Sequence, residues 1–184
     1  MGGPCLEKDP YILLESCKNH NYIPKLIHSA RLLNEEVIER ALETFFRSEK
    51  LSNSELLTIT VCGMAFKGRP ETDDLRGSPA KIILDHLRRK YNLFTIRIQD
   101  FACDNQVLEH EYQLQAVDMD VALANSDVII IANNHQMYGN MIDFIRDRGD
   151  LRLKYIYDFW SIVPREILTD KHNLRLIQFG NGRI

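Results

Sequence analysis

The sequence lacks any long apolar run and any strong excess of charge of one sign. No stretch reaches the roughly 18 uninterrupted apolar residues that a transmembrane helix needs, and the first twenty residues lack the basic and apolar segments of a leader. The formal net charge of -3 gives no general electrostatic reason to bind nucleic acid or an anionic membrane. We therefore expect a cytoplasmic protein that binds neither, with a local ligand site.

Cysteine is scarce and irregularly spaced. The four cysteines form no CxxC pair and have no nearby histidine pattern for zinc. They are Cys5, Cys17, Cys62 and Cys103. This pattern predicts reduced thiols, with neither a disulfide framework nor a metal site.

Short β-branched and aromatic runs dominate the later part of the chain. With 45% hydrophobic residues, the 184-residue chain can bury a core. The runs are TITVCG, TIRIQD, DVIIIAN, LKYIYD and a final LRLIQF, separated by helical segments. Such alternation predicts an α/β fold with a parallel sheet and helices on both faces.

A long helix is predicted over residues 24–50, which contain no glycine and no internal proline. Apolar residues recur every three or four positions, at Leu26, Ala30, Leu33 and Val37 and onward to Phe45. At 1.5 Å per residue the helix would be about 40 Å long, enough to bridge two domains or two subunits. The polar break LSNSELL then separates residues 1–54 from residues 55–184.

Several shorter helices carry recognisable start signals. Ser78 is a good cap with Pro79 at the first helical position, and Asp118 or Asp120 starts the segment DVALANS. Asp9 before Pro10 predicts the start of a helix through YILLESCKNH. Helices are also expected in YGNMIDFIRDR and VPREIL.

The loop after the first strand is the longest and most unusual, GMAFKGRPETDDLRGSPA. In open parallel sheets, ligands bind beyond the carboxyl ends of the strands, where this loop lies. Phe66 can stack, and Lys67, Arg69 and Arg76 can meet phosphate or carboxylate near the helix start at Ser78. The loop is neither GxGxxG nor a Walker sequence, so an anion site and a solvated charged loop both fit.

The opening stretch GGPCLEKDPY also admits two interpretations. A cysteine next to glycines and Lys8 can have a depressed pKa and act as a nucleophile, although most lone cysteines are inert. Further candidates follow later strands: Asn133, Asn134 and His135 after one, and Trp160 after another. The first three suit a polar loop or a ligand contact. Trp160 suits a stacked base or a lid on the core.

Two motifs together resemble the nucleotide-sugar dehydrogenases that act on UDP-glucose, UDP-N-acetylmannosamine and GDP-mannose. GGPCLEKDPYIL resembles the segment around that family's catalytic cysteine, and VCGMAFKGRPETDDLRGSPA resembles its GxAFK loop and SPA helix start. DVALANSDVIIIAN resembles a further family segment. The resemblance spans essentially the whole chain. The residues of these motifs are closer to those of the N-acetylated-sugar branch of the family.

The resemblance implies a place in the later part of the family's architecture. Residues 1–54 would end the central helical dimerisation region, and residues 55–184 would form the Rossmann-like UDP-binding domain. Family members carry a Rossmann NAD domain with GxGxxG first, and no GxGxxG occurs here. We therefore expect a C-terminal fragment that binds a UDP-sugar and dimerises through the long helix. It should not turn over without the NAD domain.

The implied reaction oxidises the C6 alcohol of the sugar to a carboxylate with two NAD+, through a cysteine thiohemiacetal and thioester. Cys5 would be the nucleophile, Asp9 would handle protons or the hydrolytic water, and Lys8 would stabilise the oxyanion near the cofactor.

Substrate contacts are implied for the two opening glycines and for the loop after the first strand. These residues are Gly2, Gly3, Phe66 and Lys67. Arg76 would reach toward the active site and cofactor. Trp160 stands where many relatives have arginine or lysine, in YDFWSIVP. A noncatalytic nucleotide-sugar-binding module or a dimerisation element are the alternative functions.

Overall fold

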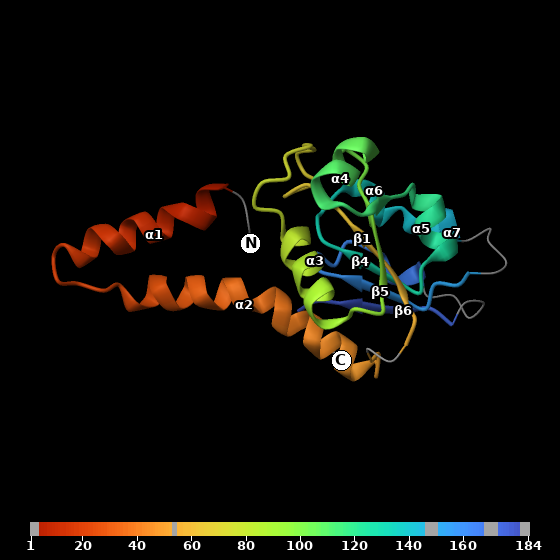
Figure 1. Cartoon of the computed structure of the whole chain (residues 1–184), viewed down its shortest axis with the longest axis horizontal. Coiled ribbons are helices and arrows are strands. Elements are labelled where there is room, and N and C mark those ends of the chain that lie inside the picture. The colour runs from red at the N-terminus through yellow and green to blue at the C-terminus, as the bar shows by residue number, and fades with distance from the viewer. Residues whose placement is uncertain (1–3, 53–54, 146–150, 168–172, 181–184) are drawn as a thin grey trace.

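A computed structural model describes residues 4–52, 55–145, 151–167 and 173–180. In this part of the chain the centre is a six-stranded parallel sheet with the order β3-β2-β1-β4-β5-β6 (Figure 1). The strands are β1 (Thr58–Cys62), β2 (Thr95–Gln99), β3 (Gln115–Ala116), β4 (Val128–Ile131), β5 (Tyr155–Asp158) and β6 (Arg175–Gln178). The prediction of a parallel α/β sheet is confirmed.

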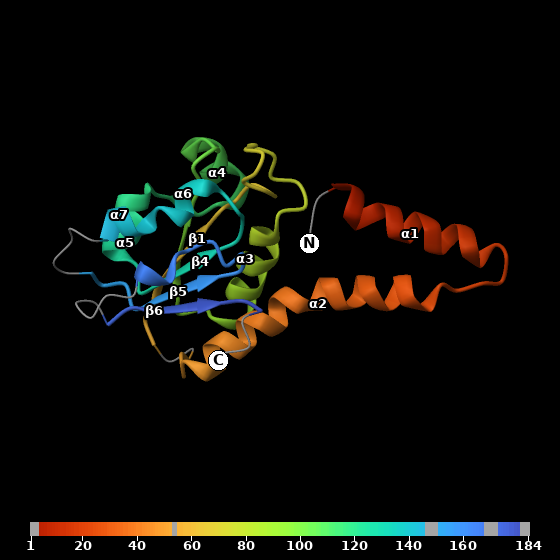
Figure 2. The same ribbon diagram turned by 180° about the vertical axis from the view of Figure 1, so that it is seen from behind.

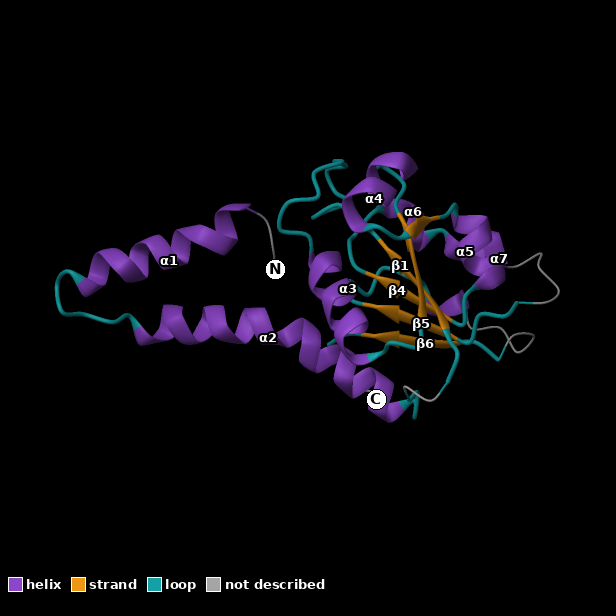
Figure 3. Cartoon of the chain, viewed as in Figure 1, coloured by secondary structure: helices purple, strands orange, loops and turns teal. Residues whose placement is uncertain are grey.

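Helices cover both faces of the sheet, as the alternation of runs predicted (Figure 3). They are α1 (Pro4–Lys18), α2 (Lys25–Ser48), α3 (Pro79–Lys90), α4 (Asn105–Tyr112), α5 (Met119–Asn125), α6 (Gln136–Gly139), α7 (Met141–Ile145) and a 3-10 turn, η1 (Arg165–Ile167). None of the helices in the described ranges is long and apolar enough to cross a membrane.

The apolar strands divide their side chains between two cores because successive residues of a strand point to opposite faces. In β4, Val128 and Ile130 join the core that also contains residues of α2 and α3. Ile129 and Ile131 join the second core, with residues of α5, α6 and α7. This division explains why β4 reads as an unbroken apolar run in the sequence.

The strand order contains one reversal of direction. The chain moves outward from β1 to β2 and β3, then returns to place β4 on the other side of β1. In open α/β sheets a ligand crevice forms at the carboxyl ends of the two strands that flank such a reversal. The fold therefore directs attention to the loops that follow β1 and β4.

The first two helices form an antiparallel hairpin that extends away from the sheet (Figures 1 and 2). Tyr11 donates a hydrogen bond to Glu35 across the hairpin, at 2.6 Å, and Glu35 also accepts one from Arg31. The Arg31 guanidinium lies 5.6 Å from the centre of the Tyr11 ring. These contacts join α1 to α2.

Only the later half of α2 packs on the sheet. Its buried residues are Ile38, Ala41, Leu42, Phe45 and Phe46. The Phe45 ring stacks on the Tyr157 ring of β5, with 4.6 Å between centroids and 4° between planes. The Tyr157 hydroxyl also donates to the Ala41 carbonyl, at 3.3 Å. One sequence-predicted helix thus serves both the hairpin and the sheet domain.

The start of the first helix differs from the sequence prediction. The helix expected from about Tyr11, with Asp9 as its cap, instead begins at Pro4, so Asp9 and Pro10 lie inside α1. Pro4 is itself suited to a first helical turn, where no N–H needs a partner, so two prolines competed as start signals. The short α4 and the two-residue β3 were not predicted. The cap at Ser78 is confirmed, because its hydroxyl accepts from the Ala80 N–H at 3.2 Å.

A histidine is buried between α2 and α3. The His86 side chain is 0% exposed and neither ring nitrogen has a hydrogen-bond partner. Burial lowers the pKa of His86, with Lys90 adding to the effect, and Glu39, at 3.9 Å from Nδ1, opposes it. Burial outweighs the carboxylate, so the neutral imidazole is the form that suits this interface.

We expect the stability of the fold to decrease as the pH falls through about 6.5, the ordinary histidine pKa. The unfolded chain then binds a proton at His86 that the folded chain, with its lowered pKa, does not bind. His86→Leu should reduce the slope of unfolding free energy against pH, measured by urea titration. His110→Leu, an exposed histidine on α4, is the control. An unchanged slope in His86→Leu would contradict the assignment.

Candidate functional site

The loops after β1 and β4 meet in direct contact at the reversal point. Gly63 has a φ of +88°, and a Cβ there would lie 2.7 Å from the backbone nitrogen of Asn133. A Cβ on Gly68 would lie 2.1 Å from the backbone nitrogen of His135. The approach is possible because both positions lack a side chain.

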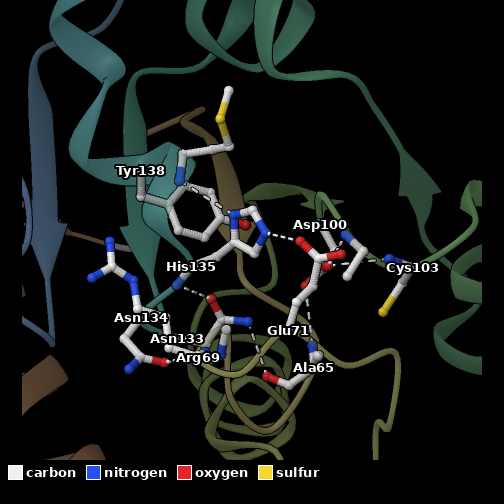
Figure 4. Close-up of polar contacts among 12 residues, drawn as sticks. Ala65, Arg69, Glu71, Asp100, Cys103, Asn133, Asn134, His135 and Tyr138 are labelled. Atoms are coloured by element: carbon white, nitrogen blue, oxygen red, sulfur yellow. Dashed lines mark hydrogen bonds and ion pairs between the residues drawn. The ribbon is translucent and has the colours of Figure 1, made fainter.

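Two consecutive asparagines cross-link these loops (Figure 4). The buried Asn133 donates from Nδ2 to the Ala65 carbonyl, at 3.1 Å. Asn134 Oδ1 accepts from the backbone nitrogens of Gly68, at 2.9 Å, and Arg69, at 3.2 Å. Of the interpretations left open by the sequence, the polar-loop role is the one these contacts support.

His135 adds a side-chain bond between the same loops. Its Nε2 lies 2.6 Å from Glu71 Oε2, and its Nδ1 accepts from the Met137 N–H, at 3.3 Å (Figure 4). Because Nδ1 is the acceptor, Nε2 carries the hydrogen and donates to Glu71. The imidazole also stacks on Phe101, from the loop after β2, with centroids 5.2 Å apart. His135 therefore holds the β1 loop in place.

Asp100, the first residue after β2, connects a third loop to the site. Its Oδ2 accepts from the Ala65 N–H, at 3.1 Å, and its Oδ1 accepts from Ala102 and Cys103, at 2.7 and 3.2 Å. Burial raises the pKa of the Cys103 thiol to about 12, and burial likewise raises that of Cys62. Both thiols are thus buried packing residues with little thiolate character.

Phe66 and Lys67 lie on the β1 loop between the segments that these bonds fix. Both are partly buried, and the Lys67 ammonium lies 5.0 Å from the centre of the Phe66 ring. Lys67 makes no ion pair with any residue of the described ranges. Its charge is consequently available to an anion at the carboxyl edge of the sheet.

Arg76 is held within its own loop. Its guanidinium binds both oxygens of Asp74, at 2.9 and 2.7 Å, and this pairing lowers the pKa of Asp74 to about 2. The Arg76 side chain is mostly exposed. Neither Arg76 nor Lys67 forms a hydrogen bond or an ion pair with Cys5, Lys8 or Asp9. A cofactor role for Arg76 would require it to leave Asp74.

The three opening candidates lie in the first turns of α1. Cys5, Lys8 and Asp9 are all exposed, and the spacing of Cys5 and Asp9 by four residues places them on one helix face. The carboxyl ends of β5 and β6 lie on the side of the sheet that faces the hairpin (Figures 1 and 2). Helix α1 begins at the end of the hairpin that is nearer the sheet. Gly2 and Gly3 lie outside the described residues.

Sequence reasoning missed two residues that shape this site, Glu71 and Asp100. Both act through loops distant in sequence, although an aspartate directly after a strand is a signal that could have identified Asp100. The residues that the structure describes contain no group of three or more metal-ligating side chains.

The comparisons with known proteins decide the family. Residues 60–165 match the model of the "UDP-glucose/GDP-mannose dehydrogenase family, UDP binding domain". The chain belongs to this family. The match runs from β1 to η1 and includes the loops that meet at the reversal point.

Relatives from two archaea illustrate the similarity. A UDP-N-acetyl-D-mannosamine dehydrogenase of Methanococcus vannielii is 29% identical over 99% of this chain and 40% of its own length. One from Pyrococcus horikoshii is 40% identical over 89% of this chain and 35% of its own length. The solved Pyrococcus horikoshii UDP-D-ManNAc dehydrogenase matches 100% of this chain and 40% of its own, with a TM-score of 0.75 and 26% identity. This chain thus spans about two fifths of these proteins.

Gly68→Ala should lower the free energy of unfolding of the domain by about 1–3 kcal/mol, the usual cost of overpacking. The added methyl group meets backbone atoms of His135, which cannot move aside as a flexible side chain would. Gly139→Ala, whose Cβ would meet only the Ile162 carbonyl at 3.4 Å, is the matched control. Thermal unfolding measures both, and equal melting temperatures for the two variants would refute the close contact.

Proposed function

We propose that this chain is the nucleotide-sugar-binding portion of an NAD-dependent UDP-sugar 6-dehydrogenase of the cytoplasm. The observation that carries the proposal is the Lys67 ammonium, which has no carboxylate partner in the described chain and lies beside the reversal point of a parallel sheet. The family description, a UDP-binding domain, supports the same ligand class.

A nucleoside diphosphate suits the charge distribution of the β1 loop. Its diphosphate carries a negative charge that Lys67 can neutralise, and charge-assisted hydrogen bonds to phosphate are stronger than neutral ones. Glu71 and Asp74, two of the three acids of the same loop, are already bound to His135 and Arg76, and the third, Asp73, is exposed. These pairings leave Lys67 and Arg69, which make no ion pair within the described ranges, as the cations of this loop that a ligand can meet.

The N-acetylated sugars are the favoured substrates. Four of the similar curated proteins are described as UDP-N-acetyl-D-mannosamine dehydrogenases, and another as a UDP-N-acetyl-D-glucosamine 6-dehydrogenase. We extend this substrate class to the present chain. Cys5 would serve as nucleophile, Asp9 as the group that handles protons, and Lys8 as a positive charge near the oxyanion.

The described residues do not fit NAD. At the end of β1, Gly63 packs on Asn133 rather than opening a GxGxxG turn, and both oxygens of Asp100 are occupied by backbone N–H groups. An acidic residue at this strand end would have to be free to bind a cofactor ribose. Lys8 and Arg76 therefore remain predictions for a cofactor held chiefly by another domain, and no reaction step follows from this sheet.

UDP should raise the melting temperature of the 184-residue chain, and Lys67→Ala should weaken UDP binding about tenfold or more, because a hydrogen bond to a charged group is lost. Lys154→Ala removes the same charge just before β5, at the opposite edge of the sheet, and should bind UDP normally. Because the described residues do not fit NAD, the 184-residue chain by itself should not reduce NAD+ when given UDP-N-acetylmannosamine.

The absence of any shift at millimolar UDP would refute the nucleotide site. A normal shift in Lys67→Ala would move the site away from the β1 loop.

We also propose that the chain forms a homodimer through α2. Leu26 and Leu33, seven residues apart on one helix face, are 83% and 63% exposed, and Tyr22 and Ile23 extend the apolar surface at the hairpin tip. A dimerisation element without ligand binding is the alternative function, and the UDP experiment separates the two.

The double variant Leu26→Glu/Leu33→Glu should sediment as a monomer at concentrations where the unchanged chain is a dimer. Burying two carboxylates in an apolar interface is strongly unfavourable. Leu56→Glu, at a position 78% exposed outside the hairpin, should remain a dimer. A monomeric unchanged chain would contradict the proposal.

A further inference from the structure

The single tryptophan of the chain lies at the carboxyl edge of the sheet. Trp160 follows β5 by two residues and is 40% exposed. Covering the core accounts only for the buried part of Trp160 and not for the part that remains exposed. A large aromatic surface that remains accessible beside a ligand crevice needs another explanation.

Trp160 is fixed in place by hydrogen bonds at both its backbone and its side chain. The indole Nε1 donates to the Ala132 carbonyl, at 2.8 Å. The backbone nitrogen donates to Asp158 Oδ1, at 2.9 Å, and the other oxygen of this fully buried carboxylate accepts from Val163, at 2.8 Å. Because the protein already satisfies the indole N–H, the exposed remainder of the side chain is the carbon surface of the ring.

The carbonyl that holds the indole belongs to the reversal point. Ala132 follows β4, and its own N–H donates to the Cys62 carbonyl at the end of β1. The next residue, Asn133, bonds to Ala65, which directly precedes Phe66 and Lys67. One strand, β4, separates β1 from β5, so the two loops are on the order of 10 Å apart, twice the usual strand spacing.

We propose that Trp160 is the platform on which the nucleobase stacks while Lys67 binds the diphosphate. This inference rests on the proposed function and adds the position of the base. An immobilised ring loses little conformational freedom on binding, and base–aromatic stacking tolerates any base because every base has a π face. A nucleoside diphosphate has the flat apolar end and the anionic end that this pair of groups would recognise.

The single tryptophan makes the stacking directly observable. UDP should quench Trp160 fluorescence with the same dissociation constant that calorimetry gives. Trp160→Ala should weaken UDP binding about tenfold, the usual order for loss of one stacked base, and Trp160→Phe should recover much of the affinity. Leu93→Ala, which removes an exposed apolar side chain shortly before β2, at the amino edge of the sheet, should bind UDP normally.

Pyrophosphate, which has no base, separates stacking from a general effect on the loops. Its affinity should be the same for the unchanged chain and for Trp160→Ala. UDP binding by calorimetry without quenching, or equal loss of UDP and pyrophosphate binding in Trp160→Ala, would overturn the platform while leaving the nucleotide site intact. Failure of UDP to bind at all would overturn the proposed function and the platform together.

Discussion

The close contact between the loops after β1 and β4 is the constraint on which the candidate site depends. Gly63 and Gly68 let the backbone of one loop touch the other, and Asn133, Asn134 and His135 bond across the contact. Among the described residues of this contact, no buried side-chain nitrogen or oxygen lacks a hydrogen-bond partner, which is the condition for a polar network to add rigidity. The charged and aromatic groups at the rim are therefore presented from a fixed base.

The sheet has the strand order of a dinucleotide-binding domain, but the loops at its crevice are arranged differently. The order β3-β2-β1-β4-β5-β6 is that of the Rossmann fold, yet the place of a pyrophosphate turn is occupied by contact between two loops. Asp100 occupies the strand end where a ribose-binding acid would stand, and instead bonds to the backbone of Ala65. The topology selects where a ligand can lie, and the side chains select which ligand it can be.

Local signals in the sequence were enough to predict the long helix, the main strands and the Ser78 cap, because each depends on neighbours a few residues away. The cross-links of Asn134 to Gly68 and of His135 to Glu71 join residues far apart in the chain. Their partners depend on which strands lie side by side, so no local pattern reveals them. The start of α1 was misplaced because Pro4 and Pro10 are both suitable first-turn residues, and only the whole helix distinguishes them.

The hairpin projects as an arm from the part of α2 that packs on the sheet domain, which begins at Ile38. About 13 residues separate Ile38 from the start of α2, roughly 20 Å of helix, so a rotation of a few degrees there moves the hairpin tip by about an ångström. Because α1 folds back along α2, its first turn lies nearer the sheet than the hairpin tip does (Figure 1). A rotation of the hairpin therefore moves the tip further than it moves the start of α1.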